Sequence, residues 1–196
     1  LLENIYLMLK KGYDQGAEGT IAYCTYDLSF HRNYYCLSDF SWNQTKRRGL
    51  KEFNKKYAKA VFGDEWMKGL EALDDLDEIS SSGTEANRFI SNLFYYPYSY
   101  VHPEKDYPRS YPGEVLEWLS KDPDETLREN LRKIKKYYEC AKRAKEKFMS
   151  VSRLKMNASP RILDHYIVEC ERYEATLRVY LLIFEALGRY REAVEN

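Results

Sequence analysis

The sequence has little of what a metal or thiol active site requires. Its 196 residues include three histidines and four cysteines, and no two cysteines are separated by only two residues. Zinc sites draw their ligands from closely spaced Cys and His residues, so we expect no metal and no cofactor. The cysteines are interpreted as reduced, mostly buried thiols of a cytoplasmic protein, although a Cys140–Cys170 bridge stays open if their helices pair.

An excess of charge and a long apolar run are also lacking. The 31 Lys and Arg residues balance 31 Asp and Glu residues, so the formal net charge is zero. A balanced chain offers no global electrostatic attraction for nucleic acid or for an anionic membrane. No apolar run approaches the ~20 residues of a membrane helix, and the opening residues lack a signal-peptide cleavage site. We therefore expect no nucleic-acid partner and no membrane partner.

The chain offers one convincing strand, over residues 19–26. These residues are mostly β-branched or aromatic, and none is charged before Asp27. An uncharged strand is typical of a parallel sheet covered on both faces. Helical spacing over residues 1–13 precedes it, which gives a helix–strand order. Because a single strand cannot satisfy its own backbone groups, we expect the chain to be the end of a larger protein whose sheet lies upstream.

Helical periodicity dominates the rest of the sequence. It predicts helices over residues 33–42, 50–62, 64–79, 84–96 and 113–120, with an irregular Pro- and Tyr-rich segment at 95–112. Two longer helices follow over 124–151 and 161–194. In the first, Leu127, Ile134, Ala141 and Phe148 are seven residues apart, and in the second, Leu163, Cys170, Leu177 and Phe184 are. A short connector makes the two helices an antiparallel hairpin within a bundle.

Trp42 and Asn43 suggest a carbohydrate site beyond the end of the strand. An indole face offers an apolar platform for a sugar ring, and an amide both donates and accepts hydrogen bonds. Asp27 stands at the carboxyl end of the strand, where ligands bind in parallel sheets and barrels. Arg32 can bind hydroxyl or carboxylate groups at the same mouth. The alternative is that Trp42 packs against the helix at 50–62 and Asn43 caps a turn.

The order of these features resembles the last unit of a glycosidase barrel. A Gly-led strand, a polar loop and a helix are followed by Ser38-Asp39-Phe40-Ser41-Trp42-Asn43 and then by an amphipathic helix that ends in Phe62-Gly63. This order is similar to the final β/α unit of β-N-acetylhexosaminidase-like (β/α)8 barrels, including O-GlcNAcase-type enzymes. The resemblance implies that residues 20–25 are the eighth strand, that residues 1–13 are the seventh helix, and that Asn43 holds a polar group of the substrate.

The resemblance covers residues 1–62 and has two departures. Gln44 stands where the family often has proline, and the catalytic acids of the family lie on a fourth strand that this chain does not contain. Helical periodicity predicts a mainly α fold with a C-terminal helical bundle over 64–196, and the resemblance implies that residues 1–62 are a remnant αβα unit of a (β/α)8 barrel. Asp27, Asp39 and Arg32 lie near the expected mouth of the site and are interpreted as pocket-lining residues, and the alternative for Asp39 is a helix-side ion pair or cap.

The sequence thus supports two main hypotheses about function. The first is the C-terminal fragment of a hexosaminidase-like glycoside hydrolase, which contributes sugar-binding residues but no catalytic residue and is inactive alone. Its partner is an N-acetylhexosamine-type carbohydrate. The second is a stand-alone helical interaction or dimerisation module, in which the strand pairs across a two-fold axis of a homodimer. A weaker third hypothesis places a ligand in the Tyr-rich segment at 95–111.

Overall fold

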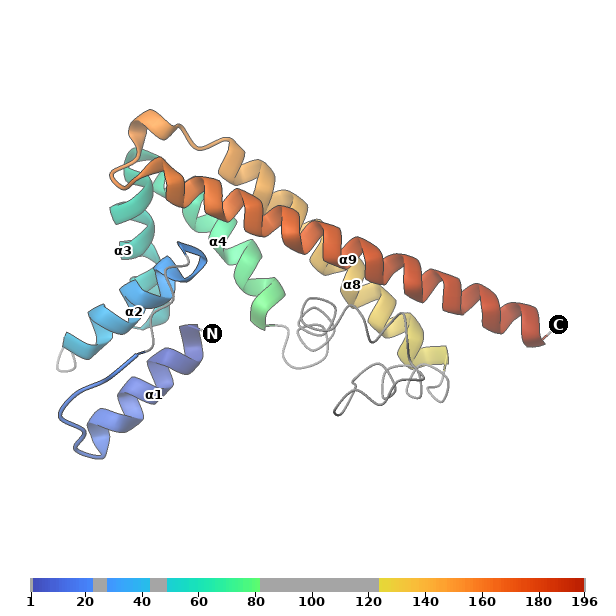
Figure 1. The fold of residues 1–196 in the computed structure, drawn as a ribbon, viewed down its shortest axis with the longest axis horizontal. Coiled ribbons are helices and arrows are strands. Elements are labelled where there is room, and N and C mark those ends of the chain that lie inside the picture. The colour runs from blue at the N-terminus through green and yellow to red at the C-terminus, as the bar shows by residue number, and fades with distance from the viewer. Residues whose placement is uncertain (1, 23–27, 43–48, 82–123, 196) are drawn as a thin grey trace. The chain divides into compact units, whose positions relative to one another are not determined.

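The computed structural model describes residues 2–22, 28–42, 49–81 and 124–195, and these residues are mainly α-helical. Figure 1 shows the helices in chain order. The α-helices are α1 (Leu2–Asp14), α2 (His31–Trp42), α3 (Leu50–Phe62), α4 (Trp66–Ser81), α8 (Asp124–Met149) and α9 (Pro160–Glu195). Short 3-10 turns are η1 (Leu28–Phe30), η2 (Gly63–Glu65) and η3 (Arg153–Lys155).

The helix bounds agree closely with the periodicity of the sequence. α3 has the predicted bounds, and α8 and α9 begin and end within two residues of theirs. α2 begins at His31 rather than at residue 33. α4 begins at Trp66 rather than at residue 64, because Asp64 lies in the preceding 3-10 turn. The helices predicted at 84–96 and 113–120 and the Tyr-rich segment at 95–112 lie outside the described residues.

The predicted strand is not seen in the part of it that the structure describes. Residues 17–22 follow an irregular path, and residues 23–26 lie outside the described residues. Ile21 is fully exposed rather than buried in a sheet. The hydroxyl of Thr20 lies 2.9 Å from that of Ser41, near the end of α2. A strand needs a neighbour to accept and donate its backbone hydrogen bonds, and no strand lies among the described residues to supply one.

The chain divides into two compact units. Unit 1 contains residues 1–77 and 143–170, and unit 2 contains residues 78–142 and 171–196. The segment after α8 joins the N-terminal helices because it completes the end of α3. The backbone amides of Asn157 and Ala158 both donate to the carbonyl of Val61, at 3.1 and 3.2 Å. These bonds satisfy a carbonyl that the end of a helix leaves without an intrahelical partner.

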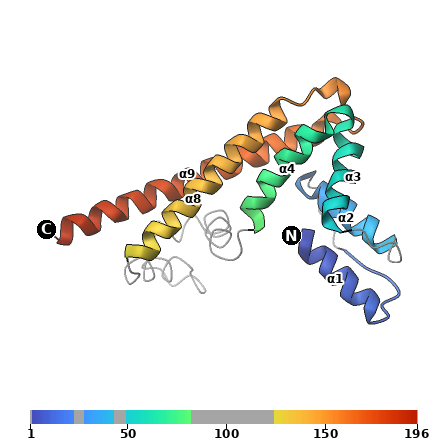
Figure 2. The same cartoon turned by 180° about the vertical axis from the view of Figure 1, so that it is seen from behind.

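Within unit 1, α1 packs against α2, and both contact α3. Figures 1 and 2 show these three helices together from opposite sides. Aromatic rings fill the contact: Tyr6 of α1 lies edge-on to Phe40 of α2 at 4.9 Å between centroids, and Phe40 lies 5.6 Å from Phe53 of α3. Each helix supplies one ring from its apolar face, and the burial of these rings against one another accounts for the packing.

A second aromatic cluster in unit 1 joins four helices. Phe62 of α3 lies 6.0 Å from Phe148 of α8 and 6.3 Å from Tyr166 of α9, and Phe148 stacks on Tyr166 at 5.0 Å. Phe62 also lies close to Gly69 of α4, where an added Cβ would be 2.0 Å from the ring. Glycine at this position therefore allows the α4 backbone to approach the ring.

Unit 2 has its own core, built from one face of α8 and one face of α9. Its buried side chains include Ile79 of α4, Ile134, Tyr137 and Ala141 of α8, and Leu177, Tyr180 and Phe184 of α9. The predicted seven-residue rows are confirmed at Ile134, Ala141, Leu177 and Phe184. Beside the row of α8, Tyr137 is buried and the adjacent Tyr138 is only partly buried.

Candidate functional site

The strongest cluster of polar side chains lies inside unit 1 and begins with Arg32. This residue occupies the first turn of α2 and forms a two-pronged ion pair with Asp77 of α4. Nη1 donates to Oδ2 at 3.1 Å, and Nη2 donates to Oδ1. The side chain of Arg32 is 12% exposed and that of Asp77 is 33% exposed. A planar guanidinium matches a carboxylate in this bidentate geometry, which fixes the contact between the two helices.

Two tyrosine hydroxyls and a histidine continue the cluster. The hydroxyl of Tyr57 on α3 lies 2.8 Å from the hydroxyl of Tyr166 on α9 and 2.8 Å from Nδ1 of His31 on α2. Tyr57 is fully buried and Tyr166 is 6% exposed. Each buried hydroxyl therefore has a hydrogen-bond partner, as burial of a polar group requires.

The surroundings hold the tyrosines and the histidine uncharged. Burial raises the pKa of Tyr57, and the neighbouring Tyr166 raises it further. Burial likewise raises the pKa of Tyr166. Burial lowers the pKa of His31, so its imidazole is neutral at pH 7. For Arg32, burial lowers the pKa, but the Asp77 carboxylate raises it together with Tyr166 and Tyr57, and the net shift of the pKa is upward.

These shifts limit the chemistry of the cluster. Burial raises the pKa of the Cys36 thiol, which lies on the same helix as Arg32, to about 12, so no thiolate nucleophile forms at neutral pH. The tyrosines keep their protons and the guanidinium is held by a carboxylate. The arrangement positions four helices relative to one another within unit 1. It is suited to specifying the packing of this unit rather than to proton transfer.

The predicted sugar-binding residues do not converge in the described part of the chain. Arg32 faces Asp77 inside unit 1, whereas Trp42 is the last residue of α2 and is 89% exposed. Ten residues separate them, about 15 Å along the helix. Asp39 forms an ion pair with Lys56 of α3, which is the alternative that the sequence left open. Asp27 and Asn43 lie outside the described residues.

The sequence did not reveal Tyr57, Tyr166 or Asp77 as members of a polar cluster. Tyr57 and Tyr166 occupy apolar rows of their helices, and periodicity cannot distinguish a hydroxyl with a buried partner from an ordinary aromatic core residue. Asp77 follows three other acidic residues of α4 within six positions and has no local feature that sets it apart. The burial of Arg32 is the feature that points to a carboxylate partner, because a buried guanidinium needs one, and this burial is known only from the structure.

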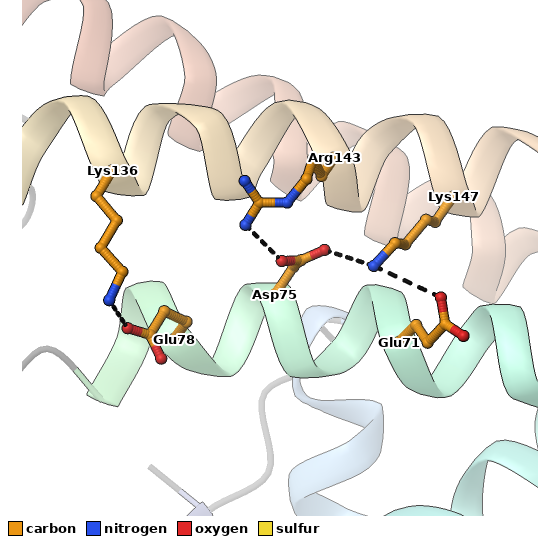
Figure 3. A network of polar contacts seen from close by, with 6 residues as sticks. All are labelled: Glu71, Asp75, Glu78, Lys136, Arg143 and Lys147. Atoms are coloured by element: carbon orange, nitrogen blue, oxygen red, sulfur yellow. Dashed lines mark hydrogen bonds and ion pairs between the residues drawn. The ribbon is translucent and has the colours of Figure 1, made fainter.

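A second group of polar contacts joins α4 to α8 and is shown in Figure 3. In unit 1, Asp75 accepts hydrogen bonds from Arg143 and from Lys147, each at 2.9 Å, and Lys147 lies 3.7 Å from Glu71. In unit 2, Lys136 pairs with Glu78. The side chain of Asp75 is 13% exposed, so its two bonds are the better shielded part of this group.

Three further features bear on the kind of site the chain can hold. Among the described residues, no group of three or more His, Cys, Asp or Glu side chains is placed to bind a metal ion. Cys36, Cys140 and Cys170 are buried and are not in disulfide bonds, so the structure does not contain the Cys140–Cys170 bridge. Within the described ranges, no helix has the length and apolar character needed to cross a membrane.

Comparison of the chain with protein-family models, with curated proteins and with solved structures gives no match.

Proposed function

We propose that the chain is a helical dimerisation module whose longest helices, α8 and α9, form a hairpin that presents the surface for association. The observation that carries this proposal is the distribution of apolar side chains on α9. Leu177 and Tyr180 are buried, whereas Val179 and Leu182 are 41% and 59% exposed. Residues two apart on a helix lie about 200° apart around it, so α9 has apolar residues on two opposite faces. A helix that is apolar on both faces is typical of one that is covered on both.

The polar residues support the same proposal. Arg32 and Asp39, which the sequence offered as ligand-binding groups, each pair with a charged residue of another helix in unit 1. Groups held in this way stabilise helix packing and have less hydrogen-bonding capacity left for a ligand. A scaffold that associates through its helices needs only such internal pairs and an exposed apolar face.

The proposal is tested by measuring the mass of the full chain in solution. Size-exclusion chromatography with light scattering is expected to give a dimer that dissociates on dilution. A mass equal to that of one chain at every concentration would refute the proposal. The control is the same measurement at high salt, where association through apolar side chains persists.

One observation favours a second function, the C-terminal part of a hexosaminidase-like glycoside hydrolase. The indole of Trp42 is 89% exposed at the end of α2, next to Asn43 in the sequence. A solvent-facing indole is available to stack on a sugar ring. In this function residues 1–62 are the last unit of the barrel of a larger enzyme, and Trp42 and Asn43 lie on its sugar-binding face, whereas Arg32 and Asp39 keep their ion pairs with Asp77 and Lys56.

The second function predicts weak binding of N-acetylglucosamine that depends on Trp42. In calorimetric titrations, Trp42→Ala should abolish the binding heat. Tyr35→Ala is a matched control, since Tyr35 is an exposed aromatic residue of the same helix. Equal heats for both variants, or no heat with the unmodified chain, would rule out a sugar platform at Trp42. Hydrolysis of an aryl N-acetylglucosaminide by this chain alone would contradict the assignment of catalysis to residues that it lacks.

A further inference from the structure

We infer that a second copy of the chain docks in antiparallel orientation on the outer stripe of α9, defined as Ala175, Val179, Leu182 and Ala186. This inference rests on the proposed dimerisation and names its surface and geometry. All four residues belong to unit 2 and are exposed. The structure thus leaves a row of aliphatic side chains in solvent on the side of α9 opposite to the core of its own unit.

The spacing of the outer stripe is that of a helix–helix seam. Its members are four, three and four residues apart, which is the alternation of a and d positions in paired helices. The core row of α9, which contains Leu177 and Phe184, has the same seven-residue period on the other side. A seven-residue period keeps a row of side chains facing one partner along the helix. The outer stripe therefore continues for about 17 Å as a straight surface that a second helix can follow.

Side-chain sizes favour an antiparallel pair centred between Val179 and Leu182. A two-fold axis at that point places Val179 of one copy against Leu182 of the other, and Ala175 against Ala186. The two larger residues then fill the centre, while the alanines at both ends let the backbones approach. Such a surface is self-complementary, as an interface about a two-fold axis must be.

Charge on the flank of the stripe favours the same orientation. Arg178 and Glu185 lie one residue before Val179 and Ala186, on the same edge of the stripe, and both are exposed. In the antiparallel pair, Arg178 of each copy lies beside Glu185 of the other, which gives two ion pairs of opposite charge. In a parallel pair each residue lies at the same level along the axis as the identical residue of the other copy. Arg178 and Glu185 are then about 10 Å apart along the axis, too far to pair.

The limited length of the stripe sets the expected affinity. Arg172 and Arg189 flank it and would meet in the antiparallel pair, so the close contact is confined to the aliphatic centre. Stable interfaces bury about 1,200 Å² or more, and a seam of about three helical turns falls below that. We therefore expect association in the micromolar range, visible as a concentration-dependent mass.

Sedimentation equilibrium of the full chain and its variants tests the surface. Leu182→Glu places a charge at the centre of the pair and should weaken association by about a hundredfold. Leu154→Glu is the control, because Leu154 is 98% exposed and lies in η3, away from the stripe in sequence and in a different unit. If Leu182→Glu still dimerises like the unmodified chain, this surface is wrong while dimerisation stands. If the unmodified chain does not dimerise, both proposals fail.

Charge reversal tests the orientation. Arg178→Glu and Glu185→Arg should each weaken association by about fivefold at low salt, because each creates like-charged neighbours across the axis. The double variant, which exchanges the two charges, should restore it. Circular dichroism of each variant checks that the helices are retained. Failure of the double variant to recover would exclude the antiparallel register.

Disulfide trapping gives an independent reading of the same register. A mixture of Ala175→Cys and Ala186→Cys chains should form a cross-linked heterodimer under mild oxidation, because these positions face each other in the antiparallel pair. Ala175→Cys alone should not cross-link. Efficient cross-linking of Ala175→Cys with itself would indicate a parallel pair and overturn the proposal. The described native cysteines, Cys36, Cys140 and Cys170, are buried and should not compete.

Discussion

Removal of Asp77 should destabilise the chain more than removal of its partner Arg32. In Asp77→Leu, the Arg32 guanidinium stays in a site where it is only 12% exposed, and it loses both hydrogen bonds of the ion pair. An uncompensated buried charge costs about 3–5 kcal/mol of unfolding free energy. In Arg32→Met, the remaining carboxylate is 33% exposed and water can solvate it. We expect that variant to lose only about 1–2 kcal/mol.

The double variant Arg32→Met/Asp77→Leu tests whether the two residues stabilise the fold as a pair or independently of each other. With both charges gone, two apolar side chains face each other, and the unfolding free energy should lie within about 1 kcal/mol of that of the unmodified chain. A double-mutant cycle would then give a coupling of about 3 kcal/mol or more. The pair of Lys56, which is 49% exposed, and Asp39, which is 17% exposed, is the control, with an expected effect of about 1 kcal/mol for Lys56→Met.

Urea unfolding followed by circular dichroism and by tyrosine fluorescence measures these differences. With a slope of about 2 kcal/mol per molar urea, Asp77→Leu should lower the midpoint by about 2 M. Coincidence of the two probes shows that a single transition is being compared. If Asp77→Leu is no worse than Lys56→Met, or if the double variant shows no recovery, the pair does not stabilise the fold. Arg32 would then again be available as a ligand-binding group.

Three further predictions concern other contacts. Gly69→Ala should lower the free energy of unfolding by about 1–2 kcal/mol, because its Cβ would lie 2.0 Å from the Phe62 ring. Gly188→Ala, which has open space around it, should raise the free energy of unfolding by about 0.5–1 kcal/mol. Thermal unfolding compares the two variants, and a change in the same direction for both would contradict the packing at Gly69. Because burial lowers the pKa of His31, the unfolded chain gains the proton first, and the stability that neutral His31 contributes is lost as pH falls below 6.5. His31→Gln should flatten this slope in urea titrations between about pH 7 and pH 5, and an unchanged slope would exclude His31 as its source. Asp75→Asn removes the charge that accepts two 2.9 Å hydrogen bonds and should cost about 1–2 kcal/mol, with a smaller effect at high salt; a loss that salt does not change would argue against an ionic contribution.

The amino-acid sequence by itself determined where most of the described helices lie. The bounds of α3 follow from its apolar spacing and from Gly63, which takes a positive φ of 58° at the end of the helix and donates its amide to the carbonyl of Lys59. Those of α9 follow from Pro160 at its first position and from a seven-residue apolar row. These features act between residues a few positions apart, so they can be read from the sequence alone.

Only the tertiary structure decided what the polar residues do. Arg32 and Asp77 are 45 residues apart, and Tyr57 and Tyr166 are 109 residues apart. No local pattern fixes such partners, because they depend on how four helices pack in unit 1. The strand expected over 19–26 also depends on tertiary contacts. Its composition favours a strand, but a strand forms only when a neighbour supplies hydrogen bonds, and the described residues include none.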